Sequence, residues 1–161
     1  MTATTDPKKG RETPRLGKLA PQFKFFLNPY TDVRFTTACP GCCGRTKQRK
    51  LPLAIHVHGW GMVMLNKTCR FCPYCDLLIA HKDEIESHLA QLRSQMAPGV
   101  LGNEYLIVGT VERKDWRRGL AKPLSAAEMI EALHDFKGHL QFEPAQRWVY
   151  TGHREKRTKP Q

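Results

Sequence analysis

Two stretches in the middle of the chain alternate apolar and polar side chains, the pattern of strands with one buried face. The first covers residues 46–58, where apolar side chains occupy every second position from Leu51 to Val57 and Pro52 suggests an edge position or a bulge. A Gly-Trp-Gly turn follows. The second stretch covers residues 62–71 and shares one face among Val63, Leu65, Cys69 and Phe71. The pattern predicts two strands joined by a turn.

Shorter runs predict further strands on both sides of this pair. Residues 32–38 predict a short strand, residues 76–81 form a short apolar run, and residues 104–111 are the most β-prone segment of the chain. Residues 147–150 predict a last strand. The aromatic cluster in residues 22–30 is expected to dock on the core, with stacking on nucleic-acid bases as the alternative.

Helical periodicity follows in two places, each introduced by the spacing of a capping box. Asp83 with Glu86 begins the first helix, and Ser125 with Glu128 begins the second. Residues 112–119 are predicted to be a charged connection. The two apolar stripes are Ile85, Leu89, Leu92 and Met96, and then Met129, Leu133, Phe136 and Leu140. The predicted class is α+β, a small antiparallel sheet with two amphipathic helices.

Six cysteines fall into two groups that share the motif C-P-x-C. Cys39 and Cys42 form the first motif, and Cys72 and Cys75 form the second. A two-residue spacer lets both sulfurs of one turn reach one ion, and two such turns complete a tetrahedron of thiolates. Cys43 and Cys69 are then spare, although either competes with a neighbouring ligand. Four histidines are possible substitute ligands: His56, His58, His81 and His88.

Residues 32–81, about a third of the chain, resemble the zinc-ribbon group of small domains, in which two C-P-x-C knuckles on β-hairpins hold one metal ion. The resemblance implies one structural Zn²⁺ without an open coordination position, and therefore a non-catalytic metal. Many ribbons have Gly directly after the second knuckle cysteine, whereas Cys43 and Asp76 stand at those places here. A single iron uses the same ligand set, so the sequence leaves zinc and iron open.

The rival interpretation is a thiol oxidoreductase. C-P-Y-C resembles the active-site motif of glutaredoxins, in which Cys72 would be a nucleophile at a helix N-terminus and Cys75 its partner. The Thr-Val-Pro sequence of that family is absent, because Thr110 and Val111 are followed by Glu112. A redox fold also leaves the upstream motif unexplained. The sequence shows no other catalytic pattern, and a non-enzymatic protein is expected.

Length and composition predict one domain over residues 23–151, with a disordered basic tail over residues 1–22 and another over residues 152–161. The formal net charge of the 161 residues is +11. Residues 1–31 carry six Lys or Arg and two acids, and residues 147–161 carry five and one. No apolar stretch approaches the roughly 20 residues of a membrane span, and no secretory signal stands at the N-terminus. A cytoplasmic protein with reduced thiols is expected.

Basic ends suit polyanions, and two internal basic groups point the same way. The first lies between the cysteine motifs, and the second surrounds a tryptophan that could stack on an unpaired base. The predicted partner is nucleic acid or a ribonucleoprotein; the alternative is a zinc-stabilised adaptor that binds protein. The candidate residues are Arg45, Lys47, Arg49 and Lys50 in the first group and Arg113, Lys114, Trp116, Arg117 and Arg118 in the second.

Overall fold

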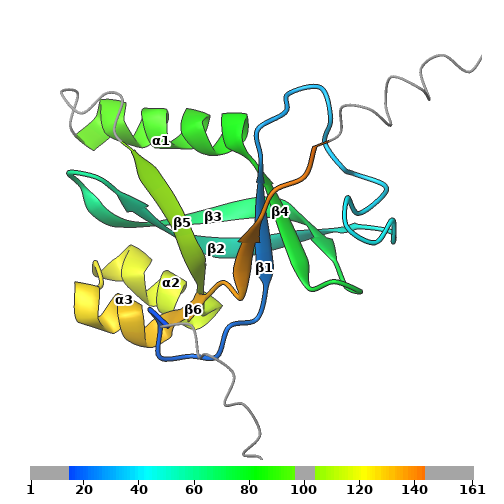
Figure 1. The fold of residues 1–161 in the computed structure, drawn as a ribbon. Helices are drawn as coiled ribbons and strands as arrows, with labels where there is room; N and C mark the ends of the chain where they lie inside the picture. The colour runs from blue at the N-terminus through cyan, green and yellow to red at the C-terminus, as the bar shows by residue number, and fades with distance from the viewer. Residues whose placement is uncertain (1–14, 97–103, 144–161) are drawn as a thin grey trace, which may run out of the picture.

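The computed structural model describes residues 15–96 and 104–143. Within these ranges seven strands form one curled sheet in the order β6-β5-β2-β3-β4-β1-β7, with α1 on one side and α2 and α3 on the other (Figure 1). The elements are β1 (Lys24–Asn28), β2 (Lys47–Val57), β3 (Gly61–Cys72), β4 (Leu77–His81), α1 (Lys82–Met96), β5 (Tyr105–Val111), α2 (Arg113–Ala121), α3 (Ala126–Ala132), β6 (Leu133–Asp135) and β7 (Gly138–Leu140). The predicted α+β class is confirmed.

The predicted pair of strands is the centre of the sheet. β2 and β3 pair antiparallel along their whole length, from Lys47 opposite Phe71 to Val57 opposite Gly61. Successive side chains of each strand point to opposite faces of the sheet, so the two strands contribute to two apolar cores. Ile55 packs in a cluster that includes Ile85 and Leu89 of α1, whereas Ala54 packs with Leu133 and with Ala132 of α3. Both faces of the sheet are therefore covered by helices at this end.

The sheet is mixed rather than antiparallel as predicted. β1 lies between β4 and β7 and runs parallel to both. Phe25 and Phe26 are buried, one on each core, so the aromatic cluster docks as a strand. Residues 15–22 also differ from the predicted disordered tail, because they lie along β6: Leu19 bridges His134, and Lys18 N–H donates to Ile130 O at 3.2 Å. Residues 1–14 lie outside the described residues.

The first helix is confirmed, although it begins at Lys82, so Asp83 lies inside its first turn and pairs with Arg34. The predicted charged connection is wrong, because it forms α2. The second helix keeps its predicted capping box at Ser125 but ends at Ala132. The remainder of the predicted stripe, from residue 133 to residue 140, forms β6 and β7 instead.

The predicted strand over residues 32–38 does not form. Only Ala38 makes a bridge there, to Arg45, and the segment is otherwise irregular. The strand predicted over residues 147–150 and the tail over residues 152–161 lie outside the described residues. Among the helices that the structure describes, none combines the length and the apolar character needed to cross a membrane.

Candidate metal centre

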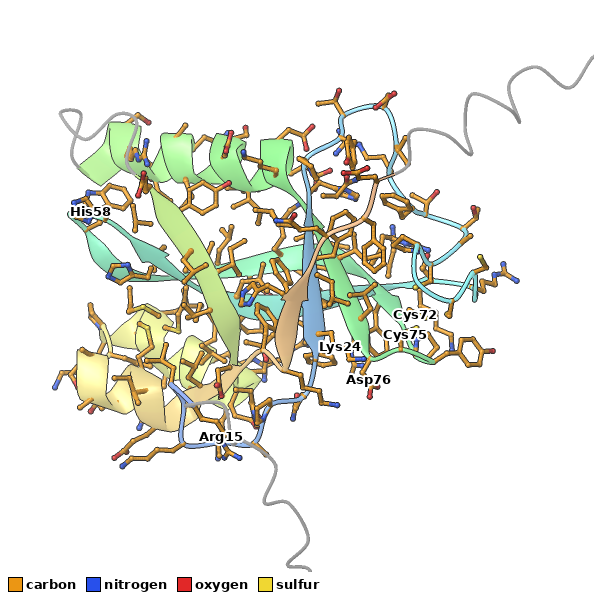
Figure 2. All side chains as sticks on the ribbon, viewed as in Figure 1. Arg15, Lys24, His58, Cys72, Cys75 and Asp76 are labelled. Carbon is orange, nitrogen blue, oxygen red and sulfur yellow. The ribbon has the colours of Figure 1, made fainter. Side chains whose placement is uncertain are left out.

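The four cysteines of the two C-P-x-C motifs come together at one end of the sheet. Cys39 and Cys42 lie in the loop before β2, Cys72 ends β3, and Cys75 lies in the turn to β4. Their sulfur atoms all lie within 4.8 Å of one another, and Cys42 Sγ is 3.5 Å from Cys72 Sγ. Figure 2 shows Cys72 and Cys75 at this end of the hairpin and His58 at the other.

This donor set fits a tetrahedral, sulfur-seeking ion. Zinc–sulfur bonds of about 2.3 Å in a tetrahedron separate the sulfurs by about 3.8 Å, close to the spacing of the cluster. Soft thiolates favour zinc, copper(I) and iron over magnesium or calcium. Backbone amides also face the sulfurs: Gly41 N–H donates to Cys39 Sγ at 3.4 Å, and Gly44 N–H donates to Cys42 Sγ at 3.3 Å. The residues present can therefore hold a metal ion.

The two turns share an unusual backbone conformation at the residue after their second cysteine. Cys43 has φ of 64° and Asp76 has φ of 53°, the left-handed region that favours glycine. These are the positions at which zinc ribbons commonly have glycine. The turn also needs Gly44, because a Cβ there would lie 2.7 Å from the Tyr74 ring and 3.1 Å from Cys42 Sγ. The two turns thus meet closely at this point.

The acidities of the thiols show why the cluster suits a cation. The pKa of Cys42 is lowered to about 7 because Gly44 N–H donates to its sulfur. The pKa of Cys75 is raised to about 12, first by its hydrogen bond to Cys42 and then by burial. Burial also raises the pKa of Cys39. Ionisation of one thiol therefore makes ionisation of the neighbouring thiols less favourable. A bound cation offsets the repulsion between the thiolates and stabilises the deprotonated form of all four cysteines.

An apolar cluster and one arginine hold the two turns in place. Cys39 and Cys72 are buried with Phe26, Leu77 and Ile79, with Phe35 and Phe142 packed against them. From β3, Arg70 donates to Thr36 O, to Thr46 O at 2.9 Å and to Thr46 Oγ1 at 3.1 Å. Arg70 thereby ties both ends of the loop that carries Cys39 and Cys42 to the strand that carries Cys72. No sequence pattern indicates this role, because two of the three acceptor atoms are backbone carbonyl oxygens.

The remaining candidate ligands lie outside the cluster. Cys69 is buried on the face of β3 that carries Phe71, as predicted, and burial raises its pKa to about 12. Cys43 is exposed beside Cys42. His81 ends β4, and its Nδ1 lies 3.2 Å from Asn28 Nδ2. His88 Nδ1 contacts Glu84 O in α1. Within the described residues, the grouping that could hold a metal contains the four matched cysteines alone.

The C-P-Y-C motif does not lead into a helix. Cys72 is the last residue of β3, and the residues after Cys75 form β4, which pairs antiparallel with β3 from Cys72 opposite Leu77. The oxidoreductase interpretation requires a helix N-terminus directly after the motif to activate the first thiol. α1 begins only at Lys82, at the far end of β4. The motif is therefore a hairpin turn rather than a strand-to-helix junction.

The two basic groups meet in the fold. Arg113, at the start of α2, donates from Nη2 to Lys50 O in β2 at 2.8 Å, a contact between residues 63 positions apart. Lys50 shares its side of the sheet with Ala54, on which α3 packs, because alternate residues of a strand face the same way. We call the exposed residues at this junction the basic face: Lys50, Arg113, Lys114, Arg117 and Arg118.

The other predicted contact residues lie elsewhere. The Arg49 guanidinium stands over the Phe23 and Phe71 rings, 5.6 Å and 5.0 Å from their centres, on the opposite face of the sheet. Lys47 lies two positions before Arg49 in β2 and therefore faces the same way, and it pairs with Phe71 of β3. Arg45 lies beside the cysteine turn and bridges Ala38. Trp116 of α2 is half-buried and lines a hollow with Met62 and Met64 of β3.

Comparison with models of protein families, with curated proteins and with solved structures found no match.

Proposed function

We propose that the four clustered cysteines bind one structural Zn²⁺ and that the protein, without enzymatic activity, binds nucleic acid or a ribonucleoprotein through the basic face. Four thiolates fill a tetrahedral zinc, leaving no position for water or substrate, so the ion stabilises the fold. Thiolate ligands need reduced cysteines, so we place the protein in a reducing compartment such as the cytoplasm.

The metal site is tested by replacing each cysteine singly. Serine at Cys39, Cys42, Cys72 or Cys75 is expected to abolish stoichiometric zinc in the purified protein, measured by elemental analysis, and to lower the melting temperature. Cys69→Ala is the matched control, because Cys69 is buried in the other core and is expected to leave zinc content unchanged. Full zinc content in a ligand variant, or iron in place of zinc, would contradict the assignment.

The nucleic-acid proposal rests on one observation, the contact between Arg113 and Lys50, which brings one residue of the first basic group beside the second group. Separately, each group is an ordinary solvated set of charges. The contact places five cationic side chains over one strand and one helix, and among residues 15–96 and 104–143 only Arg118 of these five has an acidic partner, Asp115 at 3.1 Å. A cluster of this kind binds phosphates and releases their counterions.

Salt dependence of binding distinguishes this proposal from the protein-adaptor alternative. The affinity for a labelled 20-mer RNA is expected to fall steeply and linearly on logarithmic axes as salt rises, with a slope of about −0.7 for each phosphate neutralised. Lys114→Gln with Arg117→Gln is expected to make the slope shallower by about 1 to 1.5. Lys82→Gln on α1, across the sheet, is the matched control. A salt-independent affinity, or no binding, would favour the adaptor.

A further inference from the structure

Beside the basic face, the structure has an apolar hollow that the metal site does not use. It lies between β3, α2 and α3, has a volume of about 220 Å³, and is lined mainly by Met62, Met64, Trp116, Leu120, Leu124 and Met129. Leu120 is 69% exposed at its edge, a large apolar side chain left to solvent. The hollow is smaller than the roughly 300 Å³ at which drug-sized pockets begin, so it suits one ring system.

The helix that forms one wall of the hollow also carries most of the basic face. Arg113 stands three positions before Trp116, and Arg117 stands three positions before Leu120, so helical spacing places each arginine on the same side of α2 as a lining residue. A ligand with one flat apolar group and flanking negative charges matches this arrangement. A nucleotide within a chain has both features, since every base has a π-face and every link carries a phosphate.

We propose that the ligand of the basic face is single-stranded nucleic acid and that the hollow beside Trp116 receives one of its bases. The inference rests on the proposed function and adds that the bound nucleic acid is single-stranded. In a duplex the bases are stacked and paired, so none is free to enter the hollow. An amphipathic acidic helix fits less well, because it needs a groove with anchors at several turns, whereas this site offers one hollow.

The test compares a single strand with bases, a single strand without bases, and a duplex whose bases are paired. Fluorescence anisotropy at one salt concentration would measure a 12-mer oligothymidylate, an abasic strand of equal length and a 12-base-pair duplex. The oligothymidylate is expected to bind more tightly than either. Trp116→Leu is expected to weaken its binding about 5- to 100-fold, the loss typical of one stacked base, and to leave the abasic strand unchanged. Trp116→Phe keeps an aromatic ring and should retain most of the affinity.

Two further variants distinguish a local effect in the hollow from a general loss of folding. Gly119→Ala adds a methyl 2.9 Å from Met64 Cε within the hollow, and alanine is a better helix former, so binding should weaken while the helix is kept. Trp60→Leu is the control, because Trp60 packs on the other core. The base site is wrong if the abasic strand, the duplex or a polyglutamate peptide binds as well as oligothymidylate. If no nucleic acid binds at all, the proposed function itself fails.

Discussion

At the scale of single residues, the two cysteine turns use left-handed backbone where glycine is the usual choice. An L-residue in that conformation costs about 1–2 kcal/mol, whereas glycine in a fixed conformation costs about 0.5–1 kcal/mol of entropy. Asp76 gains an ion pair, since Lys137 Nζ lies 3.3 Å from its carboxylate. Cys43 adopts the same left-handed conformation, with φ of 64°.

Cys43→Gly is therefore expected to raise the free energy of unfolding by up to about 1 kcal/mol with zinc bound, and Cys43→Val is expected to lower it by about 1 kcal/mol or more. Denaturant unfolding of the zinc-loaded proteins measures both changes. Zinc content serves as the control and should stay at the wild-type value in each. Loss of zinc from Cys43→Gly would instead make Cys43 a ligand.

A buried asparagine fixes the protonation of the histidine at the end of β4. Asn28 Nδ2 donates to Val33 O at 2.5 Å, and Asn28 Oδ1 accepts from Tyr30 N–H at 3.0 Å, so the orientation of the amide is set. Nδ1 of His81, 3.2 Å from that same Nδ2, must then accept and carry no proton. The pKa of His81 is lowered by burial first and by the charges of Arg34 and Lys67, against the opposing carboxylates of Asp83 and Glu84.

Because the folded-state pKa of His81 lies below its ordinary value of 6.5, protons bind the unfolded chain more readily. The stability of the zinc-loaded protein should thus fall as the pH drops below about 6.5, and above that pH the effect should be absent. His81→Gln, with an amide oxygen that can accept from Asn28, should show a weaker fall. Denaturant unfolding at pH 7.5 and 5.5 measures this difference. Equal falls in both proteins would contradict it.

At the scale of elements, the close pairing of β5 with β6 explains a failed prediction. Met129, Leu133, Phe136 and Leu140 have helical spacing, yet the helix ends at Ala132. Leu133 then pairs with Val111 of β5, and Phe136 stacks on Phe25 at 4.4 Å between ring centres. Both contacts are distant in sequence, so local periodicity cannot reveal them.

Gly109→Ala is expected to destabilise the fold by about 3 kcal/mol or to prevent folding, because a Cβ there would lie 2.1 Å from His134 O in the backbone of β6. Neither strand can move aside without breaking the pairing of Gly109 with Asp135. Gly138→Ala in β7 is the matched control, since nothing lies within 4 Å of its added Cβ. Thermal unfolding compares the two, and a similar melting temperature in both variants would refute the steric argument.

Sequence patterns predicted some parts of the molecule and not others. The β2–β3 pair followed from alternation, β5 from its β-prone composition and α1 from helical spacing, and the grouping of Cys39, Cys42, Cys72 and Cys75 followed from two matched motifs. α2 was missed because its sequence is dominated by charge and none of its residues is fully buried. The meeting of Arg113 with Lys50 depends on that missed helix.

At the scale of the whole molecule, the candidate metal centre belongs to one of three apolar clusters. Cys39 and Cys72 are buried with Phe26, Leu77 and Ile79, whereas the clusters beneath α1 and beneath α3 contain none of the four ligands. The clusters beneath α1 and beneath α3 therefore have a source of stability that does not depend on the cysteine site.

Removal of zinc by a chelator should therefore loosen one end of the sheet first. Amide hydrogen exchange is expected to speed up in residues 36–46 and 72–78, while amides near Leu53 and Ile55 at the centre of β2 stay protected. Mass spectrometry of peptides from the zinc-loaded and zinc-free proteins would resolve these regions. Uniform loss of protection would show instead that the entire fold depends on the ion.

The position of β1 has a consequence for the order in which the protein folds. β1 is the first strand of the described chain, yet it completes its hydrogen bonds only between β4 and β7, pairing Lys24 with Leu77 on one side and with Gly138 on the other. During synthesis, β2 and β3 can pair as soon as they leave the ribosome, whereas β1 must wait until the last strand has emerged. Until β7 has emerged, the adjacent side chains Phe25 and Phe26 therefore lack the neighbours on one side of their strand, which leaves apolar surface exposed on the nascent chain.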